Sequence, residues 1–342
     1  MRKDNFFDRY PHANKAEAER KWRLYQEEQE NLRLLEQQFQ MIQAENAQFF
    51  TAGAVAGGGS NKIGITLTYS DLDFTPVQFD SLDAWNSHFD LPNNGPAFTD
   101  IQVTEWEADP SGPFGRTGTI KLIGQPGITV RHGLFSPGDK EGDQYLTSIV
   151  DTGCITGPIM DRAFSISHNL VEVRLPYTPY IQEWNFLDCN NLSILDLSSV
   201  VTIDQGVFYN TASLGSVTLP QCTSLGSYAF YGSNVTSLYL PLVQTIGEYV
   251  MENCTYLLDL DLPKCTSIGT YTFYAAGLTR LSIPLCTNLG GSEGDDNVFN
   301  QISNRTMELI VNPYLLTNNN GDVDGDIAYL QDPTYNNTIT IN

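Results

Sequence analysis

The chain has 342 residues, of which 41% are hydrophobic, enough for a sizeable core in one or two domains with an extension. Its formal net charge is −22, and residues 1–60 hold 8 of the 18 basic residues, so the remainder has 10 basic against 31 acidic residues. A body of this charge repels a phosphate backbone, which argues against nucleic acid as a partner. An excess of acidic residues is also typical of a soluble, exposed surface.

Residues 1–12 are expected to form an anchoring peptide. Phe6, Phe7 and Tyr10 lie among charged residues there, a composition that suits a segment ordering only when it docks. Residues 1–22 are polar where the apolar core of a secretory signal would lie, so we expect assembly in the cytoplasm of a host cell. No segment approaches the roughly 20 apolar residues of a membrane helix, so membrane insertion is not expected.

Residues 13–50 lack Gly and Pro and are rich in Glu, Gln, Arg and Leu, which predicts a long helix. Its apolar residues step by three and four, as in the seam of a coiled coil, at Leu32, Leu35, Phe39, Ile42 and Phe49. This seam predicts docking onto other copies of the chain or onto another protein. The alternative is a frayed, solvated helix, since isolated helices are marginal in water. Residues 51–62 are a Gly-rich linker.

Residues 63–150 are predicted to form a β-rich module. Residues 63–69 alternate in polarity as a strand does, further strands are expected at 101–106, 119–123 and 128–130, and a short helix is expected at Trp85. The module would cap the repeats that follow, because an open first repeat would expose core and a strand edge. Residues 148–153 resemble a degenerate first repeat strand.

Residues 151–311 repeat the phrase Leu-x-x-Leu-x-Leu-Pro every 21 or 22 residues. The proline position is occupied in turn by Pro176, Ser198, Pro220, Pro241, Pro263 and Pro284. Apolar residues recur six, three and one before this position, and five and ten after it. This period predicts a leucine-rich solenoid with one β-strand plus a turn per repeat. The ten-after residues are Phe186, Phe208, Phe230, Met251 and Phe273, with Phe164 one period upstream.

The repeats resemble the BspA-like leucine-rich repeat family. The resemblance rests on "VTLPQCTSLGSYAF" (217–230) and "LDLPKCTSIGTYTF" (260–273), and it covers about residues 146–311. The chain departs from the family pattern at Ser198, which replaces the proline, and at Met251, which replaces the aromatic residue. It also departs in the last unit, where residues 290–296 are inserted. The family is common in surface proteins of Bacteroidetes and in proteins of their phages. Membership implies binding and adhesion without specifying a ligand, and it implies that residues 63–150 are the capping module of phage-type members.

Residues 312–342 are expected to form a C-terminal cap. From Met307 onward the repeat motif is replaced by a strand, a polar turn and a final strand. Within this cap, Asp322, Asp324 and Asp326 superficially fit a calcium-binding loop, but Gln331 stands where a bidentate Glu is required. The alternative is an acidic turn in which Gly325 supplies the positive φ. We therefore expect no bound metal and no cofactor.

Three of the six cysteines, Cys222, Cys265 and Cys286, occupy the position that Val200 and Val243 take in other repeats. We expect them to act as small hydrophobic residues in a reducing compartment. A disulfide between Cys265 and Cys286, on adjacent rungs, is the open alternative. The other three cysteines of the chain are Cys154, Cys189 and Cys254.

No catalytic motif occurs and the four histidines are scattered, so an enzyme is not expected. Candidate ligand-binding residues lie eight and eleven positions after the proline position: Trp184, Tyr228, Tyr249 and Tyr271, then Tyr231 and Tyr274, beside Tyr209. Such aromatic ladders can stack on sugars and form hydrogen bonds. The alternative is that they staple neighbouring turns. Outward-facing Tyr239, Asp259, Asp261 and Arg280 are other contact candidates.

These features predict a non-enzymatic bacteriophage virion protein, a fibre, decoration or tail-appendage component. Its N-terminus would dock on other virion proteins or oligomerise, and its repeats would bind a host-surface glycan or protein. Two alternatives stay open: a bacterial cell-surface adhesin and an intracellular interaction scaffold.

Overall fold

A computed structural model describes residues 63–69, 89–90, 98–103, 107–108, 116–124, 126–130, 146–290, 298–299, 306–316, 325–335 and 338–341. All of them belong to the second of two compact units, Met1–Asn61 and Lys62–Asn342. The predicted anchoring peptide, helix and linker, the short helix at Trp85 and the insertion at 291–296 lie outside the described residues.

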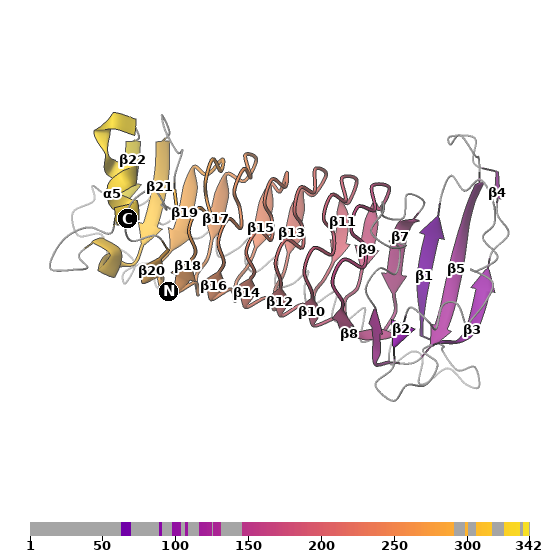
Figure 1. The fold of residues 1–342 in the computed structure, drawn as a ribbon. Coiled ribbons are helices and arrows are strands. Elements are labelled where there is room, and N and C mark those ends of the chain that lie inside the picture. Colours follow the sequence, from indigo (N-terminus) through magenta and orange to yellow (C-terminus); the bar gives the residue numbers. More distant parts are fainter. Residues whose placement is uncertain are drawn as a thin grey trace, which may run out of the picture. The chain divides into compact units, whose positions relative to one another are not determined.

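Each repeat forms two short strands (Figure 1). The first strands are centred on the apolar residue three before the proline position: β9 (Glu172–Arg174), β11 (Ile194–Asp196), β13 (Ser216–Thr218), β15 (Ser237–Tyr239), β17 (Asp259–Asp261) and β19 (Arg280–Ile283). The second strands end on the apolar residue five after it: β10 (Tyr180–Ile181), β12 (Thr202–Ile203), β14 (Ser224–Leu225), β16 (Thr245–Ile246), β18 (Ser267–Ile268) and β20 (Asn288–Leu289). The leucine-rich solenoid is confirmed, and the second strand is an addition to the predicted repeat.

The second strands build one continuous sheet along the solenoid. Its order is β2-β6-β8-β10-β12-β14-β16-β18-β20, beginning with β2 (Phe89–Asp90), β6 (Ile128–Val130) and β8 (Ile155–Ile159). From β6 onward every neighbouring pair is parallel and joins equivalent repeat positions, such as Ile246 with Ile268. The first strands instead fall into three groups, which end after β11 and after β15.

The N-terminal module is a β-sheet that merges with the solenoid. β1 (Gly64–Tyr69) pairs in antiparallel fashion with β5 (Arg116–Gly124) and with β7 (Leu146–Asp151). β5 also pairs with β3 (Phe98–Val103) and β4 (Glu107–Ala108). β7 pairs in parallel with β9 on its other side, so the degenerate strand at 148–153 is the first rung of the repeat ladder. The cap therefore satisfies the edge that an open first repeat would expose.

The C-terminal cap differs from the predicted strand, turn and strand. β21 (Thr306–Val311) pairs in parallel with β19, and β22 (Thr338–Ile341) pairs in parallel with β21, so both strands prolong the ladder. Between them lie the 3-10 helices η2 (Pro313–Leu316) and η3 (Pro333–Tyr335) and the α-helix α5 (Gly325–Gln331). The helix forms because Ile327 and Leu330, three residues apart, are both buried.

The core is a set of columns of identical positions. The most regular column holds the ten-after phenylalanines, all fully buried. Phe186 stacks on Phe164 at a centroid distance of 5.4 Å and on Phe208 at 5.5 Å. Phe208 stacks on Phe230 at 5.2 Å, and Phe273 stacks on Phe299 at 5.6 Å. Met251 fills the rung between Phe230 and Phe273 and is fully buried, because its flexible thioether adapts to a space shaped by rings.

The cysteines act as hydrogen-bonding core residues as well as small hydrophobic ones. All six are buried free thiols, including Cys265 and Cys286. The Cys189 and Cys254 Sγ atoms donate to the carbonyl oxygens of Phe164 and Phe230 at 3.1 and 3.0 Å. In the equivalent position of its own repeat, Thr211 Oγ1 donates to a phenylalanine carbonyl at 2.9 Å, so these cysteines take a place that serine and threonine also fill.

We expect the folded protein to resist thiol-modifying reagents. Burial raises the pKa of Cys222 to about 11 and the pKa values of Cys154, Cys254 and Cys265 to about 12, so the reactive thiolate is scarce at neutral pH. Mass spectrometry after iodoacetamide treatment should find no modified cysteine in the native protein and all six modified in urea. Rapid native modification of any of them would contradict this packing.

Candidate functional site

The candidate site is a row of aromatic residues on the turns that follow the second strands. We call it the aromatic stripe, and its members are half-buried: Trp184, Tyr209, Tyr228, Tyr231, Tyr249, Tyr271 and Tyr274. The eight-after members have left-handed backbone, with φ of 57° at Trp184, 62° at Tyr228, 59° at Tyr249 and 55° at Tyr271. Bulky residues rarely adopt this conformation, which costs on the order of 1–3 kcal/mol per residue.

Hydrogen bonds between rungs hold this unusual backbone in place. The N–H of Trp184 donates to the carbonyl of Gln205 at 2.8 Å. The N–H groups of Tyr228 and Tyr249 donate in the same way to Glu248 and Thr270, each at 2.9 Å. These three left-handed residues are therefore fixed by the next rung, and the rings recur at the rung spacing.

The rings of the stripe stack on one another along the solenoid. Tyr228 and Tyr249 lie 4.9 Å apart at 2°, Tyr249 and Tyr271 5.0 Å apart at 10°, and Tyr209 and Tyr231 4.6 Å apart at 4°. The stripe has two columns, the eight-after residues and the eleven-after residues. Tilted contacts join them, between Tyr228 and Tyr231 and between Tyr271 and Tyr274, both at 5.9 Å. Trp184 contacts Tyr209 at 5.7 Å, so the stripe is continuous.

This stacking determines which parts of the rings a partner can reach. Tyr228 and Tyr271 cover the two faces of Tyr249, so a sugar cannot stack there. The tyrosines do staple neighbouring turns, as the alternative interpretation held. Ring edges and phenol hydroxyls are left for a partner, and these favour hydrogen bonding over face-to-face stacking.

Gly206 takes the eight-after position in the repeat next to Trp184. Its φ is 62°, and a Cβ atom built there would lie 2.2 Å from Cε3 of Trp184. The Trp184 ring therefore lies over the Gly206 backbone, in the space that a tyrosine side chain would need. This interruption can be read from the sequence, because Gly206 stands at the repeat position that Tyr228, Tyr249 and Tyr271 occupy in other repeats.

Glu252 belongs to the site and was not found from the sequence. It stands eleven after the proline position, where other repeats place Tyr209, Tyr231 and Tyr274. Asn253 Nδ2 donates a hydrogen bond to Glu252 Oε1 at 3.4 Å. Burial raises the pKa of Glu252, and the Tyr231 hydroxyl lies near enough to the carboxylate to lower this pKa in part. Burial and the nearby Glu252 carboxylate raise the pKa of Tyr231, so its hydroxyl stays protonated and able to donate.

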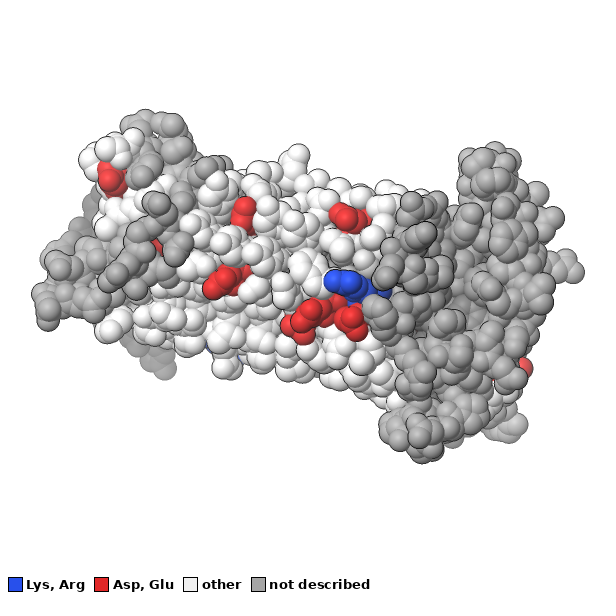
Figure 2. All heavy atoms as spheres, in the orientation of Figure 1, with Lys and Arg blue, Asp and Glu red and all other residues white. Residues whose placement is uncertain are grey.

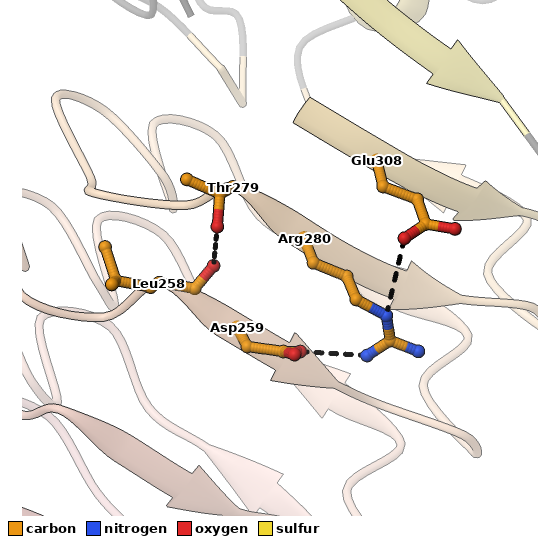
Figure 3. Close-up of polar contacts among 5 residues, drawn as sticks. All are labelled: Leu258, Asp259, Thr279, Arg280 and Glu308. Carbon is orange, nitrogen blue, oxygen red and sulfur yellow. Dashed lines mark hydrogen bonds and ion pairs between the residues drawn. The ribbon is translucent and has the colours of Figure 1, made fainter. Parts of the chain in front are cut away.

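The outward-facing strand residues make ion pairs between rungs (Figure 3). Arg280 Nη1 lies 2.8 Å from Asp259 Oδ1, and Arg280 Nε lies 4.0 Å from Glu308 Oε2. Exposed pairs of this kind contribute about 0–1 kcal/mol each. On the face shown in Figure 2, the described acidic groups are scattered over a largely uncharged surface and the described basic groups gather in one place.

Of the three aspartates of the weak calcium-loop candidate, the structure describes only Asp326. Asp326 is buried in the first turn of α5, where Oδ1 accepts a hydrogen bond from the N–H of Val298 at 2.6 Å. That bond gives Asp326 a structural role, while Asp322 and Asp324 lie outside the described residues. Among the described residues, no group of three or more His, Cys, Asp and Glu side chains could hold a metal ion.

The predicted docking residues all lie outside the described part of the chain: Phe6, Phe7, Tyr10, Leu32, Leu35, Phe39, Ile42 and Phe49. Within the described ranges, no helix is long and apolar enough to cross a membrane.

Fold and site together define a leucine-rich repeat solenoid with an aromatic stripe. Residues 146–242 and 181–305 match the BspA type leucine-rich repeat region, in six copies. The repeat region of this chain thus belongs to the BspA type, as the resemblance indicated. Repeats of this type are typical of binding and scaffold proteins. No curated protein matches the chain.

The solved structures similar to this chain include two bacterial leucine-rich repeat proteins. A leucine rich cell surface protein from Faecalibacterium prausnitzii A2-165 is 17% identical, with a TM-score of 0.27, over 44% of this chain and 60% of that one. A leucine-rich repeat protein from Bacteroides ovatus ATCC 8483 is 18% identical, with a TM-score of 0.29, over 54% of this chain and 57% of that one. The match thus spans less than two thirds of either relative.

Proposed function

We propose that this chain is a non-enzymatic binding protein and that the aromatic stripe is its contact surface. The observation that carries the proposal is the left-handed backbone at Trp184, Tyr228, Tyr249 and Tyr271. Gly206 adopts the same conformation without a side chain, so the fold does not require an aromatic residue there. Bulky rings at a strained position suit function better than stability, and tyrosine and tryptophan dominate binding hot spots.

The partner is proposed to be a glycan or protein on a host cell surface. Half-buried tyrosines present rigid edges with a hydroxyl group that donates and accepts, so they add contact area with little loss of side-chain freedom. The acidic body favours a partner that is neutral or positively charged.

Replacing three stripe tyrosines should abolish binding without unfolding the protein. We expect the triple variant Tyr228→Asn, Tyr249→Asn, Tyr271→Asn to fold, because asparagine tolerates left-handed backbone. Its binding to cells of the bacterial host, measured with fluorescent full-length protein by flow cytometry, should fall at least tenfold, as expected for a hot spot.

The matched control is Tyr256→Asn, which removes an exposed tyrosine outside the stripe. It should bind as the original protein does. Undiminished binding by the triple variant, with its melting temperature within a few degrees of the control, would rule out the stripe as the contact surface.

We further propose that the protein is displayed on a phage particle through residues 1–50. The predicted helix with an apolar seam, followed by the Gly-rich linker, supports this placement. Full-length protein should co-purify with intact virions, and protein lacking residues 1–50 should not. The alternative, display on the bacterium itself, predicts protease-accessible protein on uninfected cells, a result that would overturn the virion placement.

A further inference from the structure

One rung of the aromatic stripe carries a carboxylate in place of a ring. The eleven-after column reads Tyr209, Tyr231, Glu252 and Tyr274 on successive rungs. The eight-after column is unbroken beside it, from Tyr228 through Tyr249 to Tyr271. Glu252 therefore stands alone between two tyrosines that would otherwise have a third ring between them.

The spacing of the rungs defines the space at this position. Successive rings of the unbroken column lie 4.9 and 5.0 Å apart, so rings two rungs apart at this spacing would be about 10 Å from each other. Tyr231 meets Tyr228 at 52° and Tyr274 meets Tyr271 at 61°, so the two rings have similar orientations relative to the unbroken column. At this spacing one flat group would fit between Tyr231 and Tyr274, on the rung that carries Glu252.

Among the residues that the structure describes, no cation forms an ion pair with Glu252. The ion pairs in this part of the chain are made by Arg174 and Arg280. The groups beside the Glu252 carboxylate are uncharged: the Asn253 amide donates a hydrogen bond to it at 3.4 Å, and the Tyr231 hydroxyl lies nearby. Glu248, close enough to raise the pKa of Tyr228, adds negative charge nearby.

We propose that Glu252, Tyr231 and Tyr274 form a binding site for a guanidinium group, the side chain of an arginine on a protein partner. A guanidinium is flat, so it fits where one ring is missing and can stack on both tyrosines. It is cationic, so it is attracted to the ring faces and pairs with the carboxylate through two hydrogen bonds. An ammonium group is compact and strongly hydrated, which makes lysine a poorer match.

This proposal rests on the proposed function, because the site is part of the aromatic stripe. It narrows the partner to a protein with an exposed arginine. The acidic body around the site would attract such a partner from a distance.

The test uses three short peptides and the full-length protein. Gly-Arg-Gly should bind, as measured by chemical-shift changes or calorimetry at low salt. Gly-citrulline-Gly, equally flat but uncharged, and Gly-Lys-Gly, charged but not flat, should each bind at least about tenfold more weakly. Equal binding of the arginine and lysine peptides would show general electrostatic attraction and overturn the proposal, as would no binding by any of them.

Three variants locate the site. Glu252→Gln should weaken Gly-Arg-Gly binding about tenfold, because the charge is lost and the shape kept. Glu252→Tyr should complete the ring column and abolish binding without lowering the melting temperature. Glu248→Gln, the matched control, removes a carboxylate that does not replace a ring and should change binding less than twofold. Similar losses in Glu248→Gln and Glu252→Gln would refute the assignment to Glu252.

The two proposals can fail separately. If the triple tyrosine variant still binds cells while Gly-Arg-Gly binding depends on Glu252, the site stands and the stripe is not the cell-binding surface. If cell binding depends on the stripe but is unchanged in Glu252→Tyr, the proposed function stands and the partner does not use an arginine.

Discussion

Replacing Phe230 with alanine is expected to lower the free energy of unfolding by about 3–5 kcal/mol. Phe230 is fully buried, stacks on Phe208 at 5.2 Å, and belongs to a column whose members are fixed by the strands on either side. The neighbouring rungs cannot collapse into the space left by the ring, because parallel hydrogen bonds between β14 and β16 hold their separation. The loss of burial therefore adds to the cost of a cavity.

Urea denaturation followed by circular dichroism measures this effect. The matched control is Tyr256→Ala, which removes an aromatic ring that is 56% exposed and should change the free energy of unfolding by less than about 0.5 kcal/mol. A loss below about 1 kcal/mol for Phe230→Ala would mean that the phenylalanine column does not support the solenoid.

The Gly269→Ala substitution should destabilise the protein by about 1–3 kcal/mol or more, because it forces an overpacked contact between rungs. A Cβ atom at Gly269 would lie 2.5 Å from both the carbonyl carbon and the carbonyl oxygen of Gly247, on the preceding rung. These are backbone atoms of the residue that follows β16, and the oxygen accepts a hydrogen bond from Thr272 Oγ1 at 2.9 Å, so they cannot move aside as a flexible side chain would. The glycine of the repeated Ser-Ile-Gly phrase thus permits the close approach of neighbouring turns.

Gly215→Ala is the control for this prediction. A Cβ atom there would meet nothing within 4 Å, so the substitution should be neutral or should stabilise by roughly 0.4–1 kcal/mol through the unfolded chain. Thermal unfolding of the two variants separates the effects. Equal melting temperatures would show that the rungs accommodate a methyl group at Gly269.

Much of the fold followed from the period of the sequence, for an identifiable reason. The anchors at Leu170, Val173 and Leu175 recur unit after unit, and a solenoid buries equivalent positions equivalently. The second strand was missed because two residues, such as Tyr180 and Ile181, are too short to show alternation. Helix α5 was missed because its acidic and glycine residues match a turn as well as a helix start.

The sequence predicted which aromatic residues form the candidate site, but not the directions in which their rings point. Regular spacing identified Tyr228, Tyr249 and Tyr271, yet their left-handed backbone contradicts the preference of bulky residues, so the direction of the rings could not be inferred. Whether the rings offered faces or edges depended on that direction. Glu252 was overlooked because a charged residue on a turn has no local signature; its meaning comes from the tyrosines on the rungs before and after it.

The repeat that contains Pro241 interrupts two of the aromatic columns, the buried phenylalanine column and the eleven-after column. Met251 replaces the buried ring and Glu252 the half-buried one, and one of the three groups of first strands ends at β15, the first strand of this repeat. In a repeat array the free energy is a sum of terms within repeats and between neighbours. We therefore expect a weak neighbour term at this rung. The array would then divide into two cooperative blocks joined by the continuous sheet of second strands, and strain on the solenoid would concentrate between them before either block unfolds.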